Sequence, residues 1–177
     1  MPWKVFVRSA LACTLLGTAL FGLSLKKIES LPISITPLQF NAQNAYDYMK
    51  KLAKDYPNRV TWSDNRRKAA NWLKSELKSI GYTPRSMQFS EVIAGKQYTD
   101  LENIYAEKKG TLHPEEIIVV LAHYDITDTT IEGAMDDASG VGIVLELAKV
   151  FAKSETKRTI LFLLTDSEEF GAFWGAH

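Results

Sequence analysis

The sequence IIVVLA at residues 117–122 and the sequence TILFLLT at residues 159–165 decide the fold. Each is a continuous apolar run bounded by polar residues, which is typical of a strand buried on both faces of a sheet. Between them, residues 138–153 place apolar side chains three and four positions apart, as an amphipathic helix does. A strand, a helix and a second strand form a βαβ unit, so we expect the two strands to pair in parallel.

Two helices are predicted before this unit. In the first, apolar residues recur at helical spacing from residue 42 to residue 56, and Pro57 ends the pattern. The second has Ser63 or Asp64 available as an N-cap, and Gly81 stands where a left-handed C-terminal residue is wanted.

Two shorter extended segments, around residues 83–89 and 98–107, are split by the turn-prone pair Ala94 and Gly95. Helices alternating with strands predict the α/β class. We expect a three-layer αβα domain with a mixed, centrally parallel sheet. Strands 117–122 and 159–165 should lie in its centre, joined by a right-handed crossover.

The composition excludes some classes of protein. The chain of 177 residues has 21 Lys and Arg against 21 Asp and Glu, so it lacks the basic surplus of a strongly electropositive nucleic-acid binder. With 46% hydrophobic and 24% charged residues it has the composition of a globular protein. Cys13 is the single cysteine, which excludes an intrachain disulfide and a thiolate zinc cluster. A metal would have to be held by histidine and carboxylates.

The N-terminal region has the features of a targeting segment. Residues 9–25 are uncharged and rich in Leu and Ala, and Arg8 and Lys26 bracket them. As a helix they would span about 25 Å, slightly less than the roughly 30 Å of membrane hydrocarbon. A signal peptide or short signal anchor is expected, with the domain anchored on the extracytoplasmic side of a membrane or secreted. The predicted divisions are 1–30 (signal peptide or anchor), 31–39 (proline-containing linker) and 40–177 (folded domain).

Three polar clusters stand at the ends of the central elements. HYD, residues 123–125, follows the first strand, DDASG, residues 136–140, precedes the helix, and DSEEFG, residues 166–171, follows the second strand. Ligands of open parallel sheets bind outside the carboxyl ends of the strands. The three clusters should therefore converge on one crevice.

Each cluster alone has an ordinary structural explanation. A histidine two residues before an aspartate fits a hydrogen-bonded loop, Asp136 or Asp137 could cap the helix, and Glu168 and Glu169 could complement a helix dipole. Together they would crowd five acids around a histidine, at a cost in energy unless a cation neutralises them. One imidazole with carboxylates suits zinc, although manganese or cobalt could occupy the same set.

The motifs LAHYD, GAMDDASGVGIVLELAKVF and RTILFLLTDSEEFGAFWGA resemble the core of the di-zinc aminopeptidases, which include bacterial leucyl aminopeptidase and aminopeptidase Y. The resemblance extends upstream through YPNRVTWSDNRRKAANWLKSELKSIGY and NIYAEKKG, so it covers residues 45–177. It implies the phosphorylase/hydrolase-like fold of the zinc exopeptidases. It also implies a metal-dependent peptidase that removes N-terminal residues from peptide or protein substrates.

The resemblance also implies a role for each polar residue. His123 would bind one zinc ion, Asp136 would bridge two, and Glu169 would bind the other. Glu168 would be the general base for a hydroxide held between the ions, and it would later protonate the leaving amine. Asp125 would hold His123 in the orientation that ligation requires. Asp137 is expected to be structural.

The chain departs from the family at its C-terminal end. The family supplies a further Asp and a further His as ligands beyond the Glu168–Glu169 pair, and His177 falls at a variable position of the pattern. Each ion would then have two protein ligands, one of them shared, where three are usual. We therefore expect a C-terminally truncated domain. The 177-residue chain should bind metal weakly and hydrolyse substrate at a negligible rate.

Two other functions remain open. A glutaminyl cyclase has a similar fold and a related metal site, although the Asp-Asp pair and the His-x-Asp motif match the peptidases better. A non-catalytic, membrane-tethered domain could keep the fold as a binding surface, although retention of Glu168 argues against loss of activity. The sequence indicates neither the side-chain specificity nor the oligomeric state.

Overall fold

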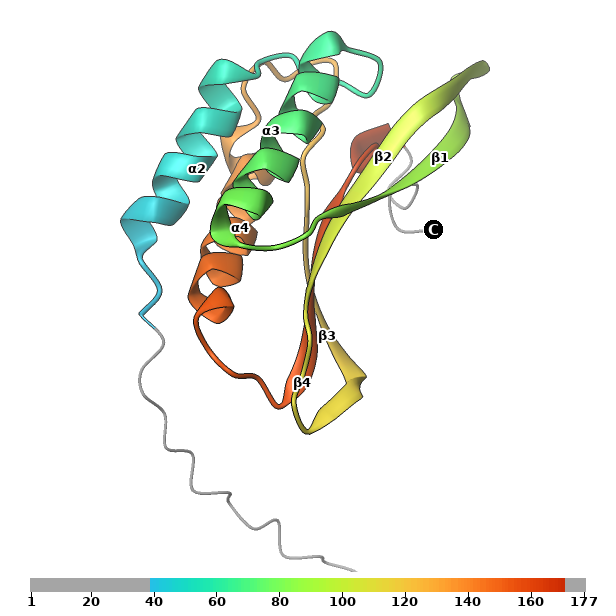
Figure 1. The fold of residues 1–177 in the computed structure, drawn as a ribbon. Coiled ribbons are helices and arrows are strands. Elements are labelled where there is room, and N and C mark those ends of the chain that lie inside the picture. Colours follow the sequence, from blue (N-terminus) through green and yellow to red (C-terminus); the bar gives the residue numbers. More distant parts are fainter. Residues whose placement is uncertain (1–38, 171–177) are drawn as a thin grey trace, which may run out of the picture. The chain divides into compact units, whose positions relative to one another are not determined.

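A computed structural model describes residues 39–170 of the chain (Figure 1). The predicted signal or anchor segment, nearly all of the predicted linker and residues 171–177 lie outside the described residues. The described helices and strands are, in chain order, α2 (Ala42–Asp55), α3 (Asp64–Ile80), β1 (Arg85–Ile93), β2 (Lys96–Lys108), β3 (His113–His123), η1 (Ala134–Ala138), α4 (Ser139–Ala152), β4 (Arg158–Thr165) and η2 (Glu168–Phe170).

The helix ends follow from capping chemistry. The Asn41 side chain accepts hydrogen bonds from two backbone N–H groups in the first turn of α2, and the helix stops before Pro57. Ser63 caps α3 by accepting from the backbone N–H of Arg66. Gly81 ends α3 with φ of 111°, a left-handed conformation that glycine adopts without strain. The predicted boundaries of both helices are confirmed.

The sheet has the order β1-β2-β4-β3. Strands β3 and β4 pair in parallel, with His123 opposite Thr165, while β2 pairs with β4 and β1 with β2 in antiparallel fashion. The expected parallel βαβ unit and mixed sheet are therefore confirmed. The central position expected for 117–122 is not found in residues 39–170, where β3 forms the edge of the sheet.

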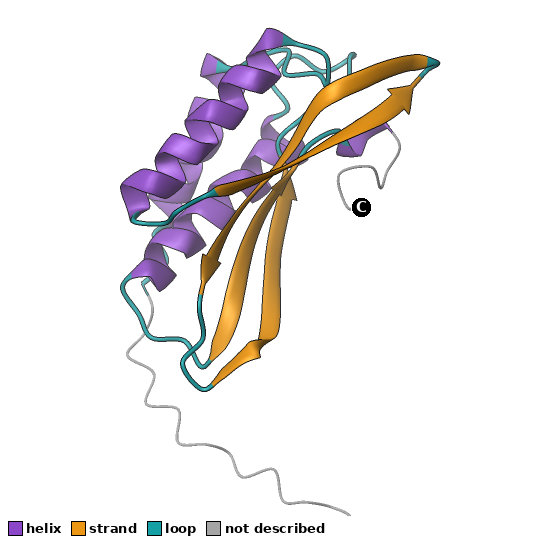
Figure 2. Cartoon of the chain, turned by 45° about the vertical axis from the view of Figure 1, so that its right-hand side comes forward, coloured by secondary structure: helices purple, strands orange, loops and turns teal. Residues whose placement is uncertain are grey.

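The three α-helices of residues 39–170 lie on one face of the sheet (Figures 1 and 2). Leu73 of α3, Leu145 of α4 and Phe162 of β4 are fully buried in the core between helices and sheet. On β3, by contrast, Ile117 is 58% and Leu121 is 62% exposed. The α/β class is confirmed, and the described residues supply two of the three expected layers. Burial of strand 117–122 on both faces is not observed, because only one face of this edge strand is covered.

The helices of residues 39–170 are all too short or too polar to cross a membrane. Residues 9–25, for which an anchor is predicted, precede the described part of the chain.

Candidate metal centre

The three polar clusters meet at the carboxyl ends of β3 and β4. His123 is the last residue of β3 and lies opposite Thr165, the last residue of β4. The chain turns after Thr165 into η2, whose first two residues are Glu168 and Glu169. Asp136 lies in η1, immediately before α4 returns along the sheet. The parallel register thus gathers residues that are up to 46 positions apart in the sequence.

His123, Asp136 and Glu169 form a compact group of possible ligands. One donor atom from each lies within 4.8 Å of the other two, and Nε2 of His123 is 3.0 Å from Oδ1 of Asp136. The His123 side chain is 12% exposed and that of Asp136 is 76% exposed, so the group opens to solvent on the Asp136 side. An imidazole nitrogen and two carboxylates are a donor set that zinc accepts. The residues present therefore fit a zinc ion.

Asp125 supports this group from below the surface. It is fully buried, and its Oδ1 lies 3.5 Å from Nδ1 of His123, which is close enough for an ion pair, although this buried nitrogen has no hydrogen-bond partner among the described residues. Its two oxygens also accept the backbone N–H groups of Glu168 at 3.1 Å and Glu169 at 3.2 Å. A proton on Nδ1 directed at Asp125 leaves Nε2 free to bind a metal. One buried carboxylate therefore orients the histidine and both glutamates, a second task that the sequence did not indicate.

Glu168 lies beside the ligand group without belonging to it. Its Oε2 is 3.9 Å from Nε2 of His123, and its side chain is 41% exposed. Glu169, its neighbour, supplies the third donor atom of the compact group. The two adjacent glutamates thus occupy different positions relative to His123 and Asp136.

Asp137 has the structural place expected of it. Its Oδ1 accepts the backbone N–H of Gly140 at 2.9 Å in the first turn of α4, and the Asp136–Asp137 peptide is cis. A Cβ on Gly140 would lie only 2.4 Å from either carboxylate oxygen of Asp137. The close approach therefore requires glycine at position 140.

The electrostatics of the site favour a cation. Burial lowers the pKa of His123, but the contact with Asp125 and the surrounding negative charges outweigh that effect and raise its pKa to about 9. Burial, with the charge of Asp136, raises the pKa of Glu169, and burial also raises the pKa of Asp137. The carboxylates repel one another in a partly desolvated place, and a bound cation would relieve this repulsion.

Two buried arginines that sequence reasoning missed adjoin the site. Arg66 of α3 contacts the buried carboxylate of Asp166 at 2.7 Å, and Asp166 also accepts the backbone N–H of Glu102 at 3.0 Å. This pair fixes the end of β4 just before the two glutamates. Arg59 lies on the other side and bonds to backbone carbonyls. Arg66 could have been noticed from its spacing, because it precedes the buried Ala69 and Ala70 by three and four residues.

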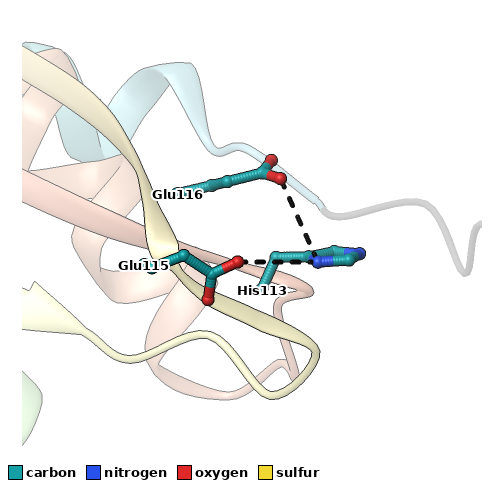
Figure 3. Close-up of side chains that lie close together, drawn as sticks. All are labelled: His113, Glu115 and Glu116. Atoms are coloured by element: carbon teal, nitrogen blue, oxygen red, sulfur yellow. Dashed lines mark ion pairs between the residues drawn. The ribbon is translucent and has the colours of Figure 1, made fainter.

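A second group of a histidine and two carboxylates lies at the opposite end of β3. Nδ1 of His113 is 3.9 Å from Glu115 and 4.0 Å from Glu116. Figure 3 shows the three side chains with their ion pairs dashed. All three side chains are exposed, and Glu116 also pairs with Arg158. His113 is the first residue of β3.

The fold and the first group define a class: an α/β protein with a candidate histidine and carboxylate metal centre at the carboxyl ends of parallel strands. Residues 103–177 match the sequence model of Peptidase family M28. A probable zinc metalloprotease of Pyricularia oryzae is 37% identical over 83 residues, which are 43% of this chain and 16% of that protein. One of Pyrenophora tritici-repentis is 31% identical over 120 residues, 59% of this chain and 25% of that protein. The chain thus spans a quarter or less of the length of these curated relatives.

Solved structures share the fold. A leucine aminopeptidase precursor from Bacteroides thetaiotaomicron superimposes with a TM-score of 0.65 and 26% identity, over 75% of this chain and 49% of that one. A glutaminyl cyclase from the same organism gives a TM-score of 0.64 and 26% identity over the same shares. The zinc exopeptidase fold is therefore confirmed. Similarity to zinc metalloproteases supports zinc as the metal.

Proposed function

We propose that the protein acts as a zinc-dependent exopeptidase of the aminopeptidase kind on peptide or protein substrates. The observation that carries the proposal is the compact group of donor atoms from His123, Asp136 and Glu169. The match to Peptidase family M28 and the named zinc metalloproteases support a peptidase rather than another use of such a site.

The described residues divide the chemistry among them. His123, Asp136 and Glu169 would hold zinc, with Asp136 shared if two ions are present. When bound, zinc supplies a Lewis acid that polarises the scissile carbonyl and makes water more acidic. Glu168 then accepts the proton of the attacking water and delivers it to the leaving amine, a task for which a carboxylate outside the ligand group is suited. Asp125 orients the imidazole of His123 and holds the backbone of both glutamates.

A second candidate, glutaminyl cyclase, is favoured by the solved neighbours that carry this name. Cyclisation of an N-terminal glutamine releases ammonia and leaves the peptide chain intact, whereas an aminopeptidase releases a free amino acid. Incubating the natural full-length protein with a glutaminyl peptide and analysing the products by mass spectrometry separates the two.

We also propose that residues 9–25 tether the domain to a membrane on its extracytoplasmic side. A vacuolar membrane protease of Candida glabrata is 22% identical over 142 residues, which are 78% of this chain and 14% of that protein. Retention of the protein in carbonate-washed membranes supports the tether, and quantitative release into the wash would overturn it.

The peptidase proposal is tested by removing and restoring the metal. In the natural full-length protein, a chelator should abolish hydrolysis of an amino-acid anilide, and added zinc should restore it. Blocking the α-amine of the substrate should greatly reduce the rate, because an aminopeptidase recognises that amine. Unchanged turnover after chelation would exclude the metal mechanism. Full activity on amine-blocked peptides would indicate an endopeptidase.

A further inference from the structure

Arg59 is a fully buried cation whose donors all face backbone. Its Nε donates to the carbonyl oxygen of Tyr124 at 2.7 Å, its Nη2 to that of Gly133 at 2.8 Å, and its Nη1 to that of Glu132. Among residues 39–170, no carboxylate forms a hydrogen bond or ion pair with it. Burying a charge costs free energy of folding, so we look for a role of this guanidinium other than stabilising the fold.

The three carbonyls belong to the two ends of one connection. Tyr124 stands between His123 and Asp125 at the end of β3, and Gly133 directly precedes η1, which carries Asp136. Arg59 therefore ties the strand that bears the histidine to the turn that bears the acid, across the intervening loop. Two of the three candidate ligands, His123 and Asp136, thus lie one and three residues from carbonyls that Arg59 contacts.

Residues around Arg59 leave room for its contact with the backbone of Gly133. Gly133 has φ of 50°, and a Cβ there would lie 2.2 Å from Ile126, 2.7 Å from the backbone oxygen of Asp136 and 3.0 Å from Nη2 of Arg59. The absence of a side chain lets the guanidinium reach the backbone. Next to it, the backbone N–H of Asn58 donates to the carbonyl of Ile131 at 2.7 Å. Residues 58 and 59 therefore both form hydrogen bonds to the loop between β3 and η1.

The charge of Arg59 is opposite to that of the neighbouring carboxylates of Asp125 and Asp137. Burial lowers its pKa to about 10, partly offset by the negative charges of Asp125 and Asp137, so the group stays protonated at neutral pH. It is a fixed positive charge on the protein side of a cluster of acids. Such a charge favours the ionised form of the nearby carboxylates without occupying a ligand position.

We infer that Arg59 is a positioning residue of the metal centre, which sets the separation of His123 and Asp136 through the backbone and offsets the charge of the acids behind them. The inference rests on the proposed zinc site. Residues that orient ligands from behind typically change metal affinity by roughly 10- to 100-fold when they are replaced.

The test measures the zinc affinity of the natural full-length protein by competition with a chromophoric chelator, and the visible spectrum of bound cobalt. Arg59→Gln and Gly133→Ala should each weaken zinc binding by about 10- to 100-fold and alter the cobalt spectrum. Arg59→Lys, which keeps the charge but cannot reach all three carbonyls, should fall between Arg59→Gln and the unaltered protein. Circular dichroism establishes that each variant is folded at the temperature of the titration.

Two controls separate positioning from general stability. Leu77→Ala removes a fully buried core side chain of α3 and should lower the melting temperature while leaving the zinc affinity of the folded protein unchanged. Lys54→Gln breaks an exposed ion pair with Glu132 and should change neither.

The outcomes distinguish this inference from the proposed function. If His123→Ala binds zinc as tightly as the unaltered protein, the proposed site is wrong. If binding needs His123 but Arg59→Gln and Gly133→Ala bind zinc normally, the role of Arg59 is overturned. Should Arg59→Gln fail to fold, Arg59→Lys and Gly133→Ala decide, and normal binding by both overturns the role.

Discussion

Each end of strand β3 has a histidine that lies close to two carboxylates. The two groups differ in how far buried residues support them. At the N-terminal end, the side chains of His113, Glu115 and Glu116 lie at the surface (Figure 3). Glu116 also pairs with Arg158, which is about equally exposed. At the C-terminal end, the largely buried His123 meets Asp136 and Glu169 over the fully buried Asp125.

The difference shows that proximity of donors is not sufficient for a metal site. Exposed side chains lose conformational freedom when they gather around an ion, and that loss opposes binding. At the C-terminal end this loss is smaller, because the His123 side chain is only 12% exposed and Asp125 holds the backbone of Glu168 and Glu169. We therefore expect function at the supported end of β3 and none at the exposed end.

The largest effect is expected from Glu168→Gln. Glutamine keeps the size and hydrogen bonding of glutamate but cannot accept the proton of water, so the rate of the natural full-length protein should fall by about 10²- to 10⁴-fold. Bound zinc should stay unchanged, because Glu168 lies outside the ligand group. Rate and metal content are measured on the same samples, with Glu115→Gln as the control at the other end of β3. If Glu168→Gln lost its metal and Glu169→Gln kept it, the two roles would be reversed.

Arg66→Met tests the buried support of the site by its effect on stability. It leaves the buried carboxylate of Asp166 without its charged partner, which typically costs about 3–5 kcal/mol. The exposed pair of Arg158 and Glu116 is the control, because loss of such a pair costs about 0–1 kcal/mol. Urea unfolding of Arg66→Met and Glu116→Gln measures both. Equal losses would mean that burial does not distinguish the two ends.

A smaller effect is expected from Asp125→Asn. The amide preserves shape but removes the charge that orients His123, so zinc affinity should fall by about 10- to 100-fold. Asp128→Asn, in an exposed part of the same loop, should leave affinity unchanged. Chelator competition measures both variants, and an unaltered affinity for Asp125→Asn would remove the proposed link between support and binding.

Periodicity and capping in the sequence predicted most of the fold. The runs at 117–122 and 159–165 have the hydrophobicity of strands, which can be read without knowing the tertiary structure. Ser63 and Gly81 act through hydrogen bonds to residues nearby in the sequence. Two features of β3 were not predictable in this way. Its edge position depends on tertiary arrangement. Its extension back to His113 involves polar residues and Pro114, which an edge strand tolerates because one side is unpaired.

The site was predictable where its residues cluster in sequence and not where they meet across the chain. The convergence of the clusters that contain His123, Asp136 and Glu169 follows from the rule that ligands bind outside the carboxyl ends of parallel strands, whereas the choice of these three as ligands came from the family resemblance. The contacts of Arg59 with Tyr124 and of Arg66 with Asp166 join residues 65 and 100 positions apart. No periodicity relates such residues, so only the folded arrangement shows them.

The central claim is that zinc binds at the supported end of β3, and one titration tests it most directly. Zinc is titrated by chelator competition into the unaltered protein, His123→Ala and His113→Ala, two substitutions of the same kind at opposite ends of one strand. Loss of binding in His123→Ala by more than about 100-fold, with His113→Ala unchanged, is the predicted result, because a removed ligand should cost more than a removed supporting residue. Equal affinities for the unaltered protein and His123→Ala, or a loss confined to His113→Ala, would contradict it.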